Sequence, residues 1–246
     1  VGPQKYYLLY EFISDEIIVT YPIGGEGVIP YRAEFIQWDT YGTQGYFDVE
    51  YSVDNGVSWT TIGNQVNGSS RIKQWPIPNS VSGQALVRVS RDGISGQSSD
   101  VFSIIDFPKN ININNVCECE FSISWNEVPF AAKYEISVLG EKYMDSIGST
   151  TETSYNIPID NPNDEVWFSV RAITENGTKG VRAVAEYYDG SGVSNCLLNS
   201  NFYTNKSQLC TDFPVNLFDQ TIGCPISWDW SFIPNTVTYL ENTNSN

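Results

Sequence analysis

The sequence predicts an all-β protein built from tandem antiparallel β-sandwiches. Hydrophobic residues alternate with polar ones at a period of two, as in Phe47, Val49, Tyr51 and Val53, which is typical of half-buried strands. Turn clusters such as YGTQG, VNGSS and ENGTKG separate these runs at roughly the 8 to 12 residue spacing of sandwich folds. The chain has 246 residues, of which 41% are hydrophobic, and this suffices for more than one core.

The first domain is expected over residues 19–106, where the last strand pattern closes shortly before Pro108. Residues 1–18 begin with the strand-like run VGPQKYYLLYEF and no turn precedes it, so we expect the last strand of a preceding domain or a linker. The chain stops at LENTNSN, in the middle of a sandwich pattern. Both ends therefore indicate a segment of a longer protein.

The second domain is expected over residues 107–197. Its segments ISWNEVPFAAKYEISVLG, TETSYNIPI and VWFSVRAITENGTKG resemble a fibronectin type III module. The resemblance implies a sandwich with Trp125 on strand B and Tyr134 on strand C. The chain departs from that family at Val166, where the tyrosine of the E–F corner usually lies.

The third piece covers residues 198–246, including CTDFPVNLFDQTIGCPISWDWSFIPNTVTYLENTNSN. It resembles the first half of a polycystic-kidney-disease (PKD) type sandwich. Trp228, Asp229 and Trp230 match the central motif of that family, although SFIPN replaces its Gly-Asp-Gly. Only the N-terminal part of such a domain is therefore expected.

The first domain is similar to an Ig-like module that stands beside such repeats in large secreted proteins of gliding bacteria with type IX secretion. The similarity lies in TYPIGGE, IQWDTYG, FDVEYSVDNGVSW and ALVRVSRDGISGQSSDVFSI. Some of those proteins are adhesins, and others are subtilisin-like peptidases in which these modules follow the catalytic domain. The resemblance thus implies an extracellular architecture rather than an activity.

Charge and composition exclude several classes of function. The formal net charge of −16 repels phosphate backbones and anionic membrane surfaces, so neither nucleic-acid binding nor membrane insertion is expected. Histidine is absent, which excludes a Ser-His-Asp triad, a Cys-His dyad and a histidine-ligated zinc site within this chain. No catalytic residue and no cofactor are therefore expected.

The segment SVDNGVSW, residues 52–59, resembles the Asp-box of sialidase propellers. A sialidase would need several such boxes and an arginine cluster, whereas this chain has one box and scattered arginines. We therefore expect a hairpin brace formed by Ser52, Asp54, Gly56 and Trp59, with a positive φ at Gly56 and the indole packed over the turn.

Carboxylates are candidates for catalytic pairs and for metal ligands. Asp48 and Glu50 share one strand face, but they alternate with apolar residues and are expected to face solvent. The segment DNPNDE offers a weak calcium candidate at Asp160 and Asp164, although it lacks the spacing of an EF-hand loop. A plain turn is the preferred interpretation.

Five cysteines without a CxxC motif predict disulfides in an oxidising, extracellular setting. Cys210 and Cys224 bracket a hairpin-sized loop and are expected to bond. Cys196 is expected to bond with Cys117 or Cys119, and the family resemblance favours Cys117. One cysteine is left over in either case.

Two surface features bear on binding and modification. The tripeptide DSI resembles the O-glycosylation motif of the same bacterial group and makes Ser146 a candidate site. Trp167 lies beside inward-facing Val166 and Phe168 and should point outward, so it forms with Tyr187 and Tyr188 a candidate surface aromatic patch.

These observations favour a non-catalytic segment of a large secreted or cell-surface protein that acts as a spacer, stalk or adhesion module. The first alternative is the C-terminal appendage of a secreted subtilisin-like serine peptidase, and the second is a carbohydrate-binding module. The expected partners are other domains of the same protein, surface glycans or other protein chains.

Overall fold

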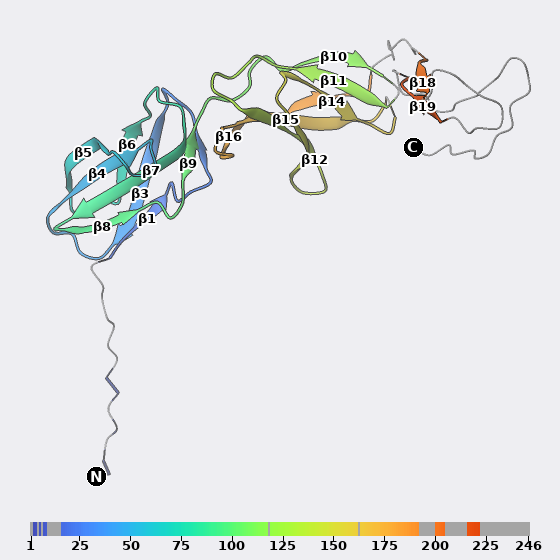
Figure 1. Cartoon of the computed structure of the whole chain (residues 1–246). Helices are drawn as coiled ribbons and strands as arrows, with labels where there is room; N and C mark the ends of the chain where they lie inside the picture. Colours follow the sequence, from blue (N-terminus) through green and yellow to red (C-terminus); the bar gives the residue numbers. More distant parts are fainter. Residues whose placement is uncertain are drawn as a thin grey trace, which may run out of the picture. The chain divides into compact units, whose positions relative to one another are not determined.

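The computed structural model describes residues 2–3, 5, 7–8, 16–117, 119–161, 163–191, 200–204 and 216–221 (Figure 1). Every regular element in these residues is a β-strand, so the predicted all-β class is confirmed. Two compact units divide the chain. The first comprises Val1–Asn110, Trp125–Thr153 and Phe168–Ala185, and the second comprises Ile111–Ser124, Ser154–Trp167 and Glu186–Asn246.

The N-terminal part of the first unit is a sandwich of two sheets. One sheet has the strand order β1 (Ile17–Tyr21), β3 (Ala33–Thr40) and β6 (Ile72–Pro76). The other has the order β2 (Gly27–Val28), β9 (Phe102–Ile104), β7 (Ser82–Arg91), β4 (Tyr46–Ser52) and β5 (Thr60–Asn67), and β8 (Ile94–Gln97) also pairs with β7. Strands β2 and β9 run parallel, whereas β4 pairs antiparallel with both β5 and β7.

Alternating side chains from both sheets build the core of this sandwich. Trp38 on β3 contacts Phe47 on β4 edge to face, with ring centroids 5.2 Å apart. Trp75 on β6 contacts Phe102 on β9 in the same manner at 6.0 Å. Such edge-to-face pairs contribute about 0.5–1.5 kcal/mol beyond the burial of their area. The alternating apolar side chains of the two sheets therefore pack against each other in one apolar layer.

One boundary expectation needs correction at the start of this sandwich. Ile17 was assigned to the segment before the first domain, but it lies in β1 and is buried in the core cluster. The reason is that Ile17 and Val19 lie on the same face of β1 and both point toward the opposite sheet. The other predicted domain boundaries remain predictions.

The residues after the first sandwich form two further sheets and one hairpin. In the second unit, β11 (Glu120–Ser124) lies between β10 (Asn112–Val116) and β14 (Ser154–Pro158). Another sheet has the order β13 (Met144–Thr150), β12 (Lys133–Leu139), β15 (Val166–Ile173) and β16 (Lys179–Arg182), and β17 (Glu186–Tyr188) also pairs with β15. Strands β18 (Phe202–Thr204) and β19 (Leu217–Asp219) pair with each other.

The predicted third piece falls mostly on residues outside the described part of the chain. Trp228, Asp229 and Trp230, which carry the resemblance to PKD-type sandwiches, are among them. The expectation of a PKD-like domain over residues 198–246 therefore remains a prediction.

Candidate functional site

The Asp-box segment forms a closed hydrogen-bonded turn between β4 and β5. The hydroxyl of Ser52 accepts hydrogen bonds from the backbone N–H groups of Gly56 at 2.8 Å and Asp54 at 3.2 Å. The same hydroxyl donates to Asp54 Oδ1 at 2.7 Å. Asp54 also accepts hydrogen bonds from the backbone N–H of Ser58 at 2.8 Å and from its hydroxyl at 2.5 Å. The side chains of Ser52 and Asp54 thus accept hydrogen bonds from the backbone N–H groups of Asp54, Gly56 and Ser58.

The backbone and the tryptophan of this turn adopt the expected geometry. Asn55 and Gly56 have φ values of 56° and 83°, in the left-handed region that favours Asn and Gly. The indole of Trp59 donates a hydrogen bond to the carbonyl of Gly56 at 3.0 Å. Arg88 lies over the indole of Trp59, with its guanidinium 4.1 Å from the centre of the ring.

The hydrogen bonds determine what Asp54 can do chemically. Donation from the side chain of Ser58, then from its backbone and from Ser52, lowers the pKa of Asp54 from 3.8 to about 2. A carboxylate with this pKa is ionised at neutral pH and cannot serve as a general acid. Asp54 therefore braces the hairpin.

The weak calcium candidate is a turn of the chain. The N–H of Asn161 donates to Asp164 Oδ2 at 2.9 Å, and the N–H of Asp164 donates to the carbonyl of Asn161 at 2.9 Å. Asp160 is exposed at the start of this turn. Within the described residues there is no group of three or more His, Cys, Asp or Glu side chains that could hold a metal ion.

Cys117 and Cys119 both take part in disulfides. The expectation that only one of the two is bonded and the other is left over is therefore wrong. Cys117 is buried, and its N–H donates to the carbonyl of Glu120 at 2.7 Å. Cys196, Cys210 and Cys224 lie outside the described residues. Because Cys117 and Cys119 are both bonded and the chain has five cysteines, the two predicted bonds, Cys210 with Cys224 and Cys196 with one of Cys117 and Cys119, cannot both form.

The structure separates the three residues of the candidate aromatic patch. Trp167 on β15 and Tyr187 on β17 are 45% and 39% exposed, and their ring centroids lie 4.7 Å apart. Tyr188, in contrast, is 3% exposed and stacks on Phe121 at 4.6 Å. Its inclusion in a surface patch was wrong, because adjacent residues of a strand point to opposite faces of the sheet.

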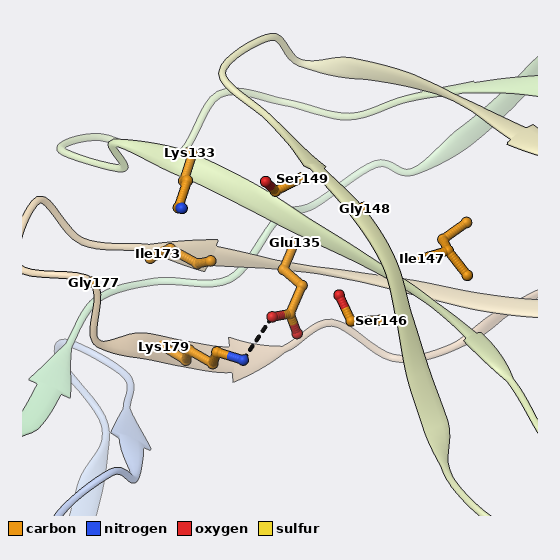
Figure 2. A pocket seen from close by; sticks show the side chains of 9 residues that line it. All are labelled: Lys133, Glu135, Ser146, Ile147, Gly148, Ser149, Ile173, Gly177 and Lys179. Carbon is orange, nitrogen blue, oxygen red and sulfur yellow. Dashed lines mark ion pairs between the residues drawn. The ribbon is translucent and has the colours of Figure 1, made fainter.

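Ser146 lies on β13 at the rim of a pocket of about 500 Å³ (Figure 2). The pocket is formed on one sheet face by β13, β12, β15 and the β15–β16 turn. Ser146 is exposed, and its glycosylation remains a prediction.

Two lining residues of this pocket, Glu135 and Lys179, belong to an ion-pair cluster that the sequence patterns did not predict. Glu135 points from β12 toward Lys179 on β16 (Figure 2), and Lys179 Nζ lies 2.7 Å from Glu135 Oε2. Arg171 on β15 donates to Glu135 Oε1 through Nε at 2.8 Å, and Arg182 Nη2 lies 3.8 Å from the same oxygen. The carboxylate is buried, with 7% of the Glu135 side chain exposed.

The cluster is electrostatically unbalanced toward positive charge. Three basic side chains around one carboxylate leave a local charge of +2 in a chain whose formal net charge is −16. Burial raises the pKa of Glu135, but hydrogen bonds from Lys179 and Arg171 lower it more, so its net pKa is below 4.5. Burial and the charge of Arg171 lower the pKa of Arg182. Glu135 is thus a fixed anion that ties three strands together.

The pairing of these charges depends on strand register, which the sequence alone does not give. Strand register places Glu135 opposite Arg171 and Arg171 opposite Arg182. Opposite charges at facing positions of neighbouring strands stabilise a sheet. Alternation along β12 places Glu135 on the face opposite Tyr134 and Ile136, but it contains no information on what covers that face.

A second group of contacts joins β16 to the first sandwich, within the first compact unit. The hydroxyl of Ser103 donates to the carbonyl of Lys179 at 2.8 Å, and the hydroxyl of Thr178 donates to the carbonyl of Gly83 at 3.1 Å. A Cβ atom on Gly27 would lie 2.5 Å from the backbone nitrogen of Val181. Glycine on β2 thus permits a backbone approach that no other residue allows.

No helix among the described residues is long and apolar enough to span a membrane.

Comparisons with known proteins give structural likenesses only. No family model and no curated protein matches the chain. Among solved structures, a protein described as FN3tt mut is 21% identical over 34% of this chain and 92% of its own, with a TM-score of 0.31. A two-domain fibronectin type III segment of chicken tenascin is 9% identical over 71% of this chain and 98% of its own, with a TM-score of 0.37. A cytokine receptor complex is 11% identical over 72% of this chain and 98% of that chain, with a TM-score of 0.42.

Proposed function

We propose that this chain is a non-catalytic spacer or stalk segment of a large secreted or cell-surface protein. The observation that carries the proposal is the set of contacts between β16 and the first sandwich. A spacer that holds its neighbours at a fixed separation must resist bending where one sandwich passes into the next sheet. The contacts at β16 supply that resistance through hydrogen bonds and close packing.

The hydrogen bonds at β16 involve side chains from both partners in the contact. Ser103 on β9 and Thr178 before β16 each donate to a backbone carbonyl on the other side. Thr178 is itself held by Thr174, because their hydroxyl oxygens lie 2.7 Å apart. Each such bond contributes about 0.5–1.5 kcal/mol, so the pair is enough to bias one arrangement strongly.

Close packing reinforces these bonds. A Cβ atom on Gly180 would lie 2.6 Å from the side chain of Ile105, which is buried. A Cβ atom on Gly83 would lie 2.2 Å from the hydroxyl of Thr174. Three glycines, including Gly27, therefore stand where the chain segments approach most closely. Sliding or hinging at this place would open voids that the packed state lacks.

Nitrogen-15 relaxation of the 246-residue protein tests the spacer proposal. We expect the amides of β4 and β12 to report one common rotational correlation time. In the double variant Ser103→Ala/Thr178→Val, the rotational correlation time of β4 should differ from that of β12. The matched control is Ser95→Ala/Thr60→Val, which alters exposed strand positions away from β16 and should change nothing. Separate tumbling in the unaltered protein would overturn the proposal.

The secreted setting and the parent protein are part of the same proposal. Its support is the resemblance of the first domain and of residues 198–246 to modules of proteins that use type IX secretion, among them adhesins. Cys117 and Cys119, both bonded, fit an oxidising compartment. Localising the parent protein in its native cells by surface proteolysis tests this setting, and protection from added protease in intact cells would contradict it.

The alternative is that these modules follow a subtilisin-like peptidase domain. Because the chain contains no histidine, the catalytic triad would belong entirely to residues outside these 246. The isolated chain should then hydrolyse no peptide substrate, whereas the full parent protein should hydrolyse one and be inactivated by a serine-directed phosphonate. A parent gene without a triad would exclude this alternative.

A further inference from the structure

We propose that Trp167 and Tyr187 form a platform that binds a neutral pyranose sugar. This inference does not depend on the spacer function, because it concerns residues of the second unit alone. It rests on the exposure of two aromatic rings in contact, on the strand pairing that holds them, and on the carboxylates around them.

The two rings present a fixed apolar surface to solvent. Trp167 is 45% exposed and Tyr187 is 39% exposed, and their planes are inclined by 31° at a centroid separation of 4.7 Å. Each ring covers part of the other, and both side chains remain partly exposed to solvent. The open part of an indole at this exposure is on the order of 100 Å², which is comparable to one face of a hexose. Sugar C–H groups pack on such faces.

Backbone pairing fixes the position of the platform. Trp167 lies on β15 and Tyr187 lies on β17, and these strands are hydrogen-bonded neighbours. A platform fixed in this way loses little conformational entropy on binding.

Carboxylates near Tyr187 define the class of sugar. Glu165, through a hydrogen bond and its charge, and Asp189, through its charge, raise the pKa of Tyr187, so both carboxylates lie near this side chain. Asp189 is ordered by hydrogen bonds from the backbone N–H of Ser191 at 3.0 Å and from its hydroxyl at 2.6 Å. Carboxylate oxygens accept hydrogen bonds from sugar hydroxyls, whereas they repel uronic and sialic acids. The ligand is therefore a neutral sugar.

The same features disfavour a protein occupant. A specific protein interface buries about 1,200–2,000 Å² in total, far more than two rings provide. A second copy of this chain would bring another net charge of −16 to a site that is already acidic. A neutral sugar needs only a small aromatic surface and a few hydrogen-bond acceptors.

A second exposed aromatic pair in the chain serves as a matched control. Tyr203 on β18 and Phe218 on β19 stack with centroids 4.8 Å apart and are 49% and 40% exposed. The exposed fractions and the ring contact are thus similar to those of Trp167 and Tyr187. The control pair differs because it contains no indole and lies on another pair of strands, β18 and β19. Replacement of Tyr203 by alanine should leave sugar binding unchanged.

The experiment is a two-dimensional NMR titration of the 246-residue protein. The probes are tetrasaccharides of β-linked glucose, mannose and N-acetylglucosamine, and the acidic counterpart is tetragalacturonic acid. We expect at least one neutral probe to shift the indole N–H signal of Trp167 and the amides of β17. Trp167→Ala and Tyr187→Ala should each weaken binding at least tenfold, whereas Tyr203→Ala should change it less than twofold.

Several outcomes would overturn the platform. One is that no neutral probe binds, and another is that tetragalacturonic acid binds more tightly than the neutral probes. A third is that Trp167→Ala and Tyr203→Ala lose the same amount of sugar affinity. Self-association that Trp167→Ala abolishes would point to a second copy as the occupant and would also overturn the proposal. Thermal melts and amide spectra establish that each variant is folded, and Tyr187→Ala replaces Trp167→Ala if the latter does not fold.

Discussion

Arg171 and Glu135 face each other across β15 and β12, and the guanidinium donates to a single carboxylate oxygen through both Nε, at 2.8 Å, and Nη2. Lys179 occupies the second oxygen from β16. One buried carboxylate therefore joins three neighbouring strands of the sheet. A buried ion is stable only when it is paired and hydrogen-bonded. We therefore expect changes to this cluster to alter the free energy of unfolding.

Replacement of Glu135 by glutamine should destabilise the protein by roughly 2–3 kcal/mol. The substitution keeps the shape of the side chain but leaves Arg171, Lys179 and Arg182 without a counter-charge. Urea unfolding followed by tryptophan fluorescence measures the loss. The control is Glu50→Gln, because the Glu50–Arg88 pair is more exposed and should contribute only about 0–1 kcal/mol. Equal effects of the two variants would show that the Glu135 cluster has no special role.

The free energy of unfolding should fall as the pH drops below 4.5. The folded-state pKa of Glu135 lies below its ordinary value of 4.5, so the folded state binds fewer protons than the unfolded state in this range. Its contribution is complete above pH 4.5 and is lost as the pH falls through the folded-state pKa. Unfolding curves between pH 6 and pH 2 measure the slope. Glu135→Gln should give a shallower slope, and an unchanged slope would assign the acid sensitivity to other carboxylates.

The carboxyl group of Asp54 should titrate at a pKa of about 2. The largest cause is the hydrogen bond from the Ser58 hydroxyl, so Ser58→Ala should move the pKa upward toward 3.8. Carbon-detected NMR titration of the Asp54 side chain measures both values. Ser69→Ala, in a neighbouring turn, should leave the titration unchanged. A pKa near 3.8 in the unaltered protein would mean that the turn does not hold Asp54 as described.

Replacement of Gly27 by alanine should loosen the attachment of β16. The new Cβ would meet the backbone of Val181 and Gly180, which cannot rotate away. Overpacking of this kind costs about 1–3 kcal/mol, so exchange of the β16 amides should accelerate roughly tenfold to a hundredfold. Gly63→Ala is the matched control, because its nearest neighbour is the flexible end of Lys73, at 2.8 Å. Hydrogen exchange measured by mass spectrometry compares the two variants.

Peptide mapping without reduction should show Cys117 and Cys119 in disulfides. Cleavage after Glu118 separates the two cysteines, so each partner can be assigned by mass. The sequence analysis predicts that Cys196 bonds with one of them. Detection of either Cys117 or Cys119 as a free, alkylated thiol would contradict the structure.

Local sequence patterns predicted much of the fold. The run Phe47, Val49 and Tyr51 indicated a strand, and the structure places it in β4. The positive φ at Gly56 and the packing of Trp59 followed from the Asp-box alone. These features depend on residues a few positions apart, so composition and period suffice to predict them.

The same patterns failed where both faces of a strand are covered. On β12, Tyr134 and Ile136 are buried on one face, but Glu135 and Ser137 on the other face are buried as well. The candidate aromatic patch, in contrast, ignored alternation when it grouped Tyr187 with Tyr188, and only Tyr187 is exposed. A period of two distinguishes the two faces of a strand but carries no information on which of them meets solvent.

The sequence by itself determined the all-β class, the turn positions and the hairpin brace, since each follows from neighbouring residues. Only the tertiary structure decided the contacts between residues that are far apart in the sequence. Glu135 and Arg171 are 36 positions apart, and Ser103 and Lys179 are 76 positions apart. Which charges meet, which aromatic rings stay exposed and where β16 is fastened depend on strand register and on backbone approach, and these are set by the packing of the whole sheet.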